Sequence, residues 1–253
     1  MKDSTIYNVR VIERAMQILS CFDGEQSERG ISEIARLVGL SPATVLRILV
    51  TLQSGGYVER AADGAKYRLG MRVVEMGFGA LRRLEVRRLA KPRMVALEQQ
   101  FQETCDLSVF NRGEMLCVEV VQSRHALRVA SAPGYRSPLH CTASGKVFLA
   151  HLDPDEAARL LSGPLMRYTE KTITSPERLM AQLVEVRARG YAIDDEELGA
   201  GGRAVAASIR GRDGSVVGVI AVVGPVERMG EERVREIAAA LIAAANDISA
   251  SMA

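Results

Sequence analysis

Polar, basic and small apolar side chains alternate in the segment from Ser41 to Arg47. Hydroxyl groups bind phosphates, a guanidinium can donate two hydrogen bonds to the edge of guanine, and small apolar groups contact the methyl group of thymine. If the segment opens a helix, the residues left facing outward are Ser41, Ala43, Thr44, Leu46 and Arg47, with Pro42 at the helix start. These residue types indicate a surface that reads base edges in double-stranded DNA.

A second segment, Thr142 to Lys146, superficially resembles a phosphate-binding loop. A Walker loop requires Gly five positions before Gly145, where His140 stands, and Ser or Thr after the lysine, where Val147 stands. The segment is better interpreted as a helix start, where unpaired backbone N–H groups and the positive end of the helix dipole favour a carboxylate. It is therefore a candidate anion site, and no catalytic residue is assigned.

The elements that must position the first segment have the order of a helix-turn-helix. A second helix over 32–38 ends at Gly39, and Ser41-Pro42, a preferred N-cap followed by a preferred first residue, begins a third helix over 42–54. A preceding helix over 11–22 is predicted from apolar residues at three- and four-residue spacing, namely Val11, Ile12, Ala15, Ile18, Leu19 and Phe22. The third helix has its own apolar stripe, Val45, Ile48, Leu49 and Leu52.

A β-hairpin is predicted after these helices, because alternating runs at 57–60 and 66–69 flank a segment of turn residues. Its Arg60, Lys66 and Arg68 can meet the DNA backbone, which contributes affinity and salt dependence without sequence information. Residues 1–88 also hold 14 Lys and Arg against 10 Asp and Glu, whereas residues 89–253 hold 19 against 21. The order of elements indicates a winged helix-turn-helix, although similar compact domains also bind other proteins.

The length of 253 residues and the 47% hydrophobic content are sufficient for two buried cores. Residues 71–84 are predicted to form a helix interrupted by Gly77 and Gly79, and residues 86–104 a second helix. Further along, the patterns predict strands at 106–111, 114–122 and 127–131, helices at 143–151, 154–162 and 176–189, a hairpin of 203–210 with 216–223, and a helix at 231–251. This mixed order indicates an α+β fold.

Composition excludes several classes of protein. The polar N-terminus and the absence of an apolar run of about 18 residues favour a cytoplasmic protein without a membrane partner. The four cysteines, Cys21, Cys105, Cys117 and Cys141, are scattered and are expected to be reduced thiols. His125, His140 and His151 lie far apart, so no structural zinc, other metal or cofactor is expected.

The chain resembles the IclR family of bacterial transcription regulators over nearly its whole length. The front part of the resemblance is carried by Arg14-Ala15, Ile18-Leu19, Ile34-Ala35, Gly39-Leu40-Ser41, Thr44-Val45, Arg47-Ile48-Leu49, Leu52 and Gly55-Gly56-Tyr57. The rear part is carried by Pro138-Leu139-His140, Thr142-Ala143, Gly145-Lys146 and the run from Gly190 to Glu197.

This resemblance implies a winged helix-turn-helix DNA-binding domain at 1–70, a linker helix at 71–88, and an effector-binding domain at 89–253 that is similar to GAF-type sensors, with an antiparallel sheet flanked by helices. It implies a regulator whose affinity for its DNA operator changes with a small organic acid, and which works as a homodimer or tetramer. An enzyme acting on such an acid, fused to a DNA-binding domain, and a regulator without a ligand stay open as alternatives.

The resemblance also implies an effector pocket. The amides of Ala143 and Ser144 would hold the acid group, and Asp194 would be a polar partner at the pocket edge, although an acidic string such as 194–197 is also typical of a solvated loop. The further pocket residues that it implies are Val129, Ser137, Leu139, Cys141, Gly202, Ala204, Ala221 and Val223. Where family members that bind very small oxo-acids often present Cys, Ser and Ser, this chain has Ala204, Ala221 and Val223, and Gly202 replaces a leucine. A larger, partly hydrophobic or aromatic acid is therefore expected.

Overall fold

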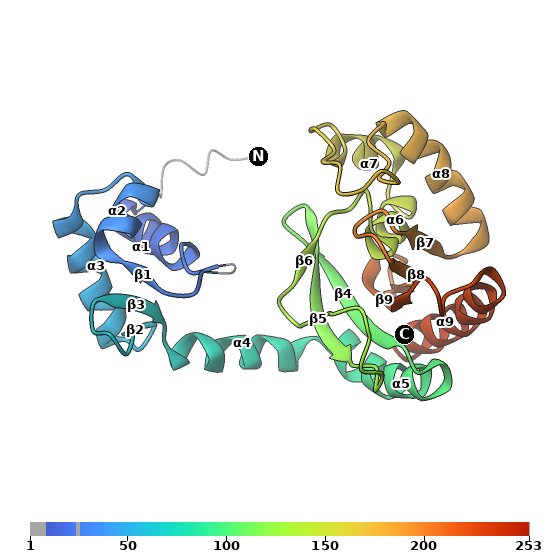
Figure 1. The fold of residues 1–253 in the computed structure, drawn as a ribbon, viewed down its shortest axis with the longest axis horizontal. Helices are drawn as coiled ribbons and strands as arrows, with labels where there is room; N and C mark the ends of the chain where they lie inside the picture. Colours follow the sequence, from blue (N-terminus) through green and yellow to red (C-terminus); the bar gives the residue numbers. More distant parts are fainter. Residues whose placement is uncertain (1–8, 24–25, 253) are drawn as a thin grey trace. The chain divides into compact units, whose positions relative to one another are not determined.

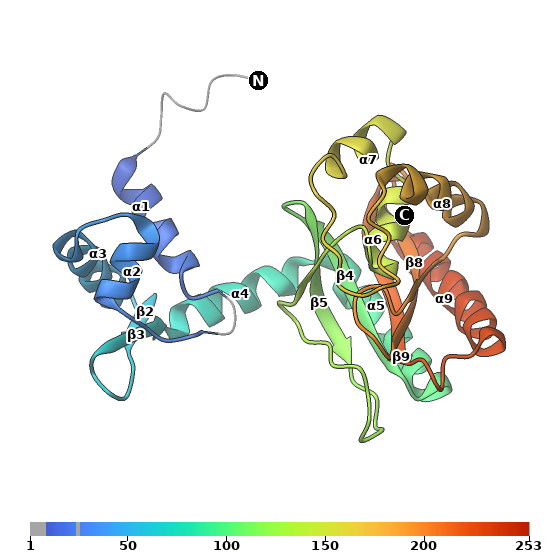
Figure 2. The ribbon, with the colours of Figure 1, turned by 45° about the horizontal axis from the view of Figure 1, so that its top comes forward.

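The computed structural model describes residues 9–23 and 26–252. The chain divides between Arg83 and Leu84 into two compact units, each with its own buried core. Figures 1 and 2 show the first unit in blue to green, and the second from green through yellow to red.

The first unit contains three packed helices and a small antiparallel sheet with the strand order β1-β3-β2 (Figure 1). Gly39 adopts a left-handed conformation, with φ 65°, and so ends the second helix and turns the chain into the third. The core is formed by apolar side chains from all three helices and by Val58 and Tyr67 of the sheet. The elements are α1 (Arg10–Ser20), β1 (Arg29–Gly30), α2 (Ile31–Val38), α3 (Pro42–Ser54), β2 (Val58–Arg60), β3 (Lys66–Leu69) and α4 (Met71–Arg83).

The second unit is built on a six-stranded antiparallel sheet with the order β6-β5-β4-β9-β8-β7. Its strands are β4 (Thr104–Asn111), β5 (Glu114–Val121), β6 (Arg136–Ser137), β7 (Ala192–Asp195), β8 (Gly202–Arg210) and β9 (Val216–Pro225). Its helices are α5 (Glu85–Phe101), α6 (Ala143–Ala150), α7 (Pro154–Leu160), α8 (Pro176–Arg189) and α9 (Glu231–Ser251). Together with the first unit this is the α+β fold expected from the sequence.

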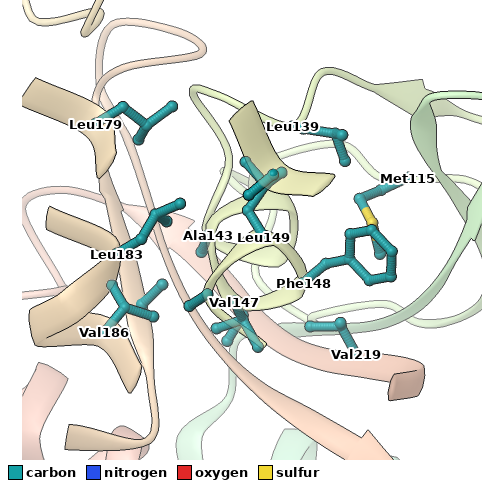
Figure 3. Packing of buried hydrophobic residues seen from close by; sticks show 14 of the residues in the cluster. Met115, Leu139, Ala143, Val147, Phe148, Leu149, Leu179, Leu183, Val186 and Val219 are labelled. Atoms are coloured by element: carbon teal, nitrogen blue, oxygen red, sulfur yellow. The ribbon is translucent and has the colours of Figure 1, made fainter. Parts of the chain in front are cut away.

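Helices cover both faces of this sheet (Figures 1 and 2). Successive residues of β9 point to opposite faces of the sheet, and their contacts show which helix covers each face. Val219 and Ala221 pack in the hydrophobic cluster of α6, whereas Gly218 lies against Val86 of α5 on the other face. In Figure 3, α6 presents Val147 and Leu149 within a buried cluster that also contains side chains of α8 and of the strands. Every residue of α6 is buried, so this helix is held rigidly between the sheet and α8.

Two predictions about elements are wrong. Residues 127–131 form no strand, because the edge of β5 is instead paired with β6, with Met115 opposite Ser137. The helix α4 is continuous through Gly77 and Gly79, since glycine costs a helix only about 1 kcal/mol and need not interrupt it. Val11 and Ile12, part of the apolar spacing that predicts α1, are 59% and 56% exposed, and only the later turns of that helix reach the core.

No single helix within the described residues is long and apolar enough to cross a membrane. The helices α2 and α3 reach that length and composition only as a pair, and the chain bends by 108° between them. Across the same residues no three His, Cys, Asp or Glu side chains gather as a metal site would require.

Candidate functional site

The outer face of α3 presents the residues that the sequence singles out. Ser41, Pro42, Ala43, Leu46 and Arg47 are exposed and Thr44 is half-buried, whereas the stripe of Val45, Ile48 and Leu49 is buried. The Ser41 hydroxyl accepts a hydrogen bond from the amide of Thr44 and lies 2.9 Å from the Thr44 hydroxyl. The N-cap therefore orients the first turn of α3 while its side chains project outward.

Arg47 lies beside a groove between α1 and α3. The groove has a volume of about 560 Å³, and its lining includes Val11, Ile12 and Thr44. Among the described residues the Arg47 side chain makes no hydrogen bond or ion pair, and it is exposed. Its five N–H groups are therefore available for an external acceptor.

The three basic residues of the wing differ in how they are held. Arg60 donates a hydrogen bond of 2.6 Å to the carbonyl of Gly64 and stacks over the ring of Tyr67 at 5.0 Å. Arg68 forms an ion pair of 2.8 Å with Glu59. Lys66 is exposed, and its ammonium has no ion-pair partner in the described part of the chain. Of the three, Lys66 is thus the cation that the hairpin leaves most accessible to a phosphate.

A cavity of about 90 Å³ lies in the second unit, between the sheet and the start of α6. Its apolar side is formed by Ala204, Ala221 and Val223, from β8 and β9. The other residues expected from the sequence that line it are Val129, Ser137, Ala143, Ser144 and Asp194. The cavity therefore brings together eight of the eleven expected pocket residues.

The other three expected residues lie elsewhere. Gly202 lines a neighbouring cleft of about 560 Å³, which shares Val129, Asp194 and Val223 with the cavity. Leu139 is buried in the hydrophobic cluster with Val147, and Cys141 is buried without lining the cavity or the cleft.

The start of α6 offers backbone donors to the cavity. The Thr142 hydroxyl accepts a hydrogen bond of 3.1 Å from the amide of Gly145, whereas the amides of Ala143 and Ser144 have no acceptor within the helix. Gly145 is required by close packing, since a β-carbon there would stand 2.3 Å from the carbonyl oxygen of Leu139. The helix start is therefore fixed against the preceding loop, and it faces the cavity with unpaired N–H groups that suit an anion.

Asp194 and Glu197 are buried, so the alternative of a solvated loop is wrong for these two residues. The amide of Glu197 donates a hydrogen bond of 2.8 Å to a carboxylate oxygen of Asp194. Burial nevertheless raises the pKa of Asp194 to about 6. The Glu197 carboxylate forms an ion pair with Lys146 of α6, whose side chain is fully buried. This pair joins the acidic segment to the helix that opens on the cavity.

Sequence reasoning missed the polar side of the cavity. Asp106 and Ser108 of β4, the strand next to β9, line this side together with Cys117, Ser131 and Tyr135. Burial raises the pKa of Asp106 to about 6, and Ser131 donates a long hydrogen bond of 3.4 Å to its carboxylate. The signal was the alternation along β4, which directs Asp106 and Ser108 to the face opposite that of Cys105 and Leu107.

Two family models match the chain. The IclR helix-turn-helix domain matches residues 11–62, and the C-terminal domain of the bacterial transcriptional regulator IclR matches residues 78–250. The chain is 38% identical to the transcriptional regulator KdgR of Escherichia coli K12 over 230 aligned residues. The alignment covers 90% of this chain and 88% of that protein.

Two solved structures extend the comparison. An IclR transcriptional regulator from Alicyclobacillus acidocaldarius has a TM-score of 0.87 and 26% identity, covering 98% of this chain and 100% of the other. An IclR homologue from Microbacterium hydrocarbonoxydans was solved with bound 4-hydroxybenzoate. It has a TM-score of 0.84 and 29% identity, and the match covers 96% of this chain and 98% of the other.

Proposed function

Because this chain belongs to the IclR family of bacterial transcriptional regulators, we propose that it binds an operator through α3 and changes its DNA affinity when a small organic acid occupies the cavity. The observation that carries the proposal is the exposed face of α3 in a winged helix-turn-helix, with Arg47 free to donate. In this proposal residues 1–70 form the DNA-binding domain, residues 71–88 form the linker between the two domains, and residues 89–253 form the effector-binding domain. The protein acts where bacterial DNA lies, in the cytoplasm.

We infer that the acid group of the effector binds the amides of Ala143 and Ser144, since the Thr142 cap leaves them free. The apolar side of the cavity supports an effector with a hydrophobic or aromatic body. The solved relative that holds 4-hydroxybenzoate binds a molecule of this kind. The neighbouring cleft offers room for parts of an effector that extend beyond the cavity.

The test is a titration of operator DNA, selected from a random pool, with the full chain in the presence and absence of candidate acids. A regulator changes its operator affinity and returns the acid unchanged, which chromatography of the mixture establishes. Conversion of the acid would instead favour the enzyme alternative, and an operator affinity that ignores every acid would favour a regulator without a ligand.

Arg47→Ala is expected to weaken operator binding by about 1 to 3 kcal/mol, with a much smaller effect on random DNA, because a bidentate contact to guanine discriminates between sequences. Lys66→Ala, the matched change in the wing, should instead weaken binding to every sequence and lower the salt slope by about one unit. Fluorescence anisotropy at several salt concentrations measures both. Equal losses for Arg47→Ala on operator and random DNA would make Arg47 a phosphate contact.

We further propose that the protein works as a homodimer or tetramer. Operators of helix-turn-helix proteins are commonly read as two half-sites about 34 Å apart, which a two-fold dimer spans. The helix α4 buries none of its residues in the described chain and exposes Met71, Met76 and Phe78, a surface that a second copy can cover. Sedimentation of the full chain should give at least twice the 27.5 kDa of one copy, and a stable monomer, alone and on DNA, would contradict this.

A further inference from the structure

The cavity of the second unit has an acidic lining without a basic counterpart. Of the residues that line it, only Asp106 and Asp194 carry carboxyl groups, and none is Lys, Arg or His. Asp194 is already bound by backbone amides, those of Glu197 at 2.8 Å and Leu198 at 3.4 Å. Asp106 has only the long bond from Ser131 among the described residues, although a carboxylate can accept about four hydrogen bonds. Of the two carboxyl groups in the cavity, that of Asp106 is thus the one that can accept more additional hydrogen bonds.

Asp106 lies next to the apolar side of the cavity in the sheet. It is the partner of Ala221 in the register of β4 and β9, and both residues line the cavity. Ser108, two positions along β4, continues the same polar side. A molecule whose apolar body lies on Ala221 therefore has the carboxyl group of Asp106 beside it.

Resting on the proposed function, we propose that Asp106 selects the effector by accepting a hydrogen bond from a hydroxyl group that the organic acid carries in addition to its carboxylate. The carboxylate of the effector is received at Ala143 and Ser144, and the hydroxyl supplies the donor that Asp106 lacks. An acid without the hydroxyl would displace water from the Asp106 carboxyl group and place only carbon beside it, which leaves that group unsatisfied.

A hydroxyl fits this site better than an ammonium group. Removing a cation from water costs far more than removing a hydroxyl, and the neighbours of Asp106 in the cavity are neutral Ser108, Cys117 and Ser131. The raised pKa of Asp106, caused by burial, agrees with an environment that disfavours charge. The inferred class is therefore a hydroxylated organic acid with an apolar segment between or beside its polar groups.

The experiment is calorimetric titration of the full-length protein with acids that differ by one substituent: benzoate against its 2-, 3- and 4-hydroxy derivatives, and pentanoate against its hydroxy derivatives and 5-aminopentanoate. For the natural chain, at least one hydroxy acid should bind about tenfold more tightly than its parent. In Asp106→Ala this ratio should fall to about one, with binding of the parent acid retained, and the near-isosteric Asp106→Asn should give an intermediate ratio. Melting temperatures and DNA affinity verify that each variant is folded.

Asp247→Asn is the matched control, because it makes the same change at an exposed carboxylate of α9, paired with Arg93, outside the cavity. It should keep the ratio of the natural chain. An equal preference for the hydroxy acid in the natural chain and in both Asp106 variants would overturn the assignment of Asp106, as would tighter binding of the amino acid. If no acid of any pair binds the natural chain, the proposed effector role itself fails, and the assignment falls with it.

Discussion

Lys146→Met is expected to lower the free energy of unfolding of the second unit by about 3 to 5 kcal/mol, the usual cost of leaving a buried charge without its partner. The Lys146 side chain is fully buried and lies 2.5 Å from the Glu197 carboxylate. The second oxygen of that carboxylate already lacks a hydrogen-bond partner in the described structure. Methionine keeps most of the volume of lysine, so the loss reports the missing charge and not a cavity.

Lys171→Met provides the matched comparison. Lys171 also forms an ion pair, with Glu196, but its side chain is 49% exposed, and such surface pairs contribute about 0 to 1 kcal/mol. Because the chain contains no tryptophan, urea unfolding is followed by circular dichroism, and hydrogen exchange of residues 143–150 reports on α6 directly. Adding Glu197→Gln to Lys146→Met should recover part of the loss. Similar small losses for both lysines would show that the buried pair adds little to stability.

Gly145→Ala is expected to destabilise the second unit by about 3 kcal/mol or more, because the new methyl group has no space. It would stand 2.3 Å from the carbonyl oxygen and 2.4 Å from the α-carbon of Leu139, and backbone atoms cannot rotate away as a side chain can. The helix start must therefore move from the loop, and Ala143 and Ser144 move with it. Acid binding should weaken along with stability.

The control for this prediction is Gly163→Ala, in the second unit, where a β-carbon would meet nothing within 4 Å. Alanine leaves the unfolded chain less freedom than glycine, so this variant should be as stable as the natural chain or gain up to about 1 kcal/mol. Thermal unfolding and calorimetric titration with benzoate compare the two variants. A Gly145→Ala protein as stable as the natural chain would mean that α6 adjusts easily, and the close packing at its start would then not determine acid binding.

Local features of the fold could be predicted from the sequence because their causes are local. The third helix runs from Pro42 to Ser54 as predicted, since the Ser41 cap and the glycines that follow Ser54 determine its ends. The same holds for α8 and α9, whose limits agree with the predicted ranges. The exposure of Val11 and Ile12 could not be predicted in this way, because an apolar stripe on a helix does not say how far along the helix the core extends.

The cavity shows a different limit. Its apolar side was expected at Ala204, Ala221 and Val223, but Asp106 comes from a strand far earlier in the chain, and nothing near it in sequence indicates that β9 will pair beside it. The segment 127–131 looked like a strand because it is apolar and short. Its Val129 and Ser131 instead line the cavity. They do so because β6, and not this segment, pairs with the edge of β5.

The pairing of β4 with β9 also affects the order in which the chain can fold during synthesis. Asp106 and Ala221 are neighbours in the sheet, so the centre of the second unit cannot close until nearly the whole protein has left the ribosome. The first unit needs nothing beyond Arg83, and domains generally fold as they emerge. A nascent chain can therefore carry a folded DNA-binding unit before β9 has been synthesised. During that time the edge of β4 that later pairs with β9 is unpaired and exposed.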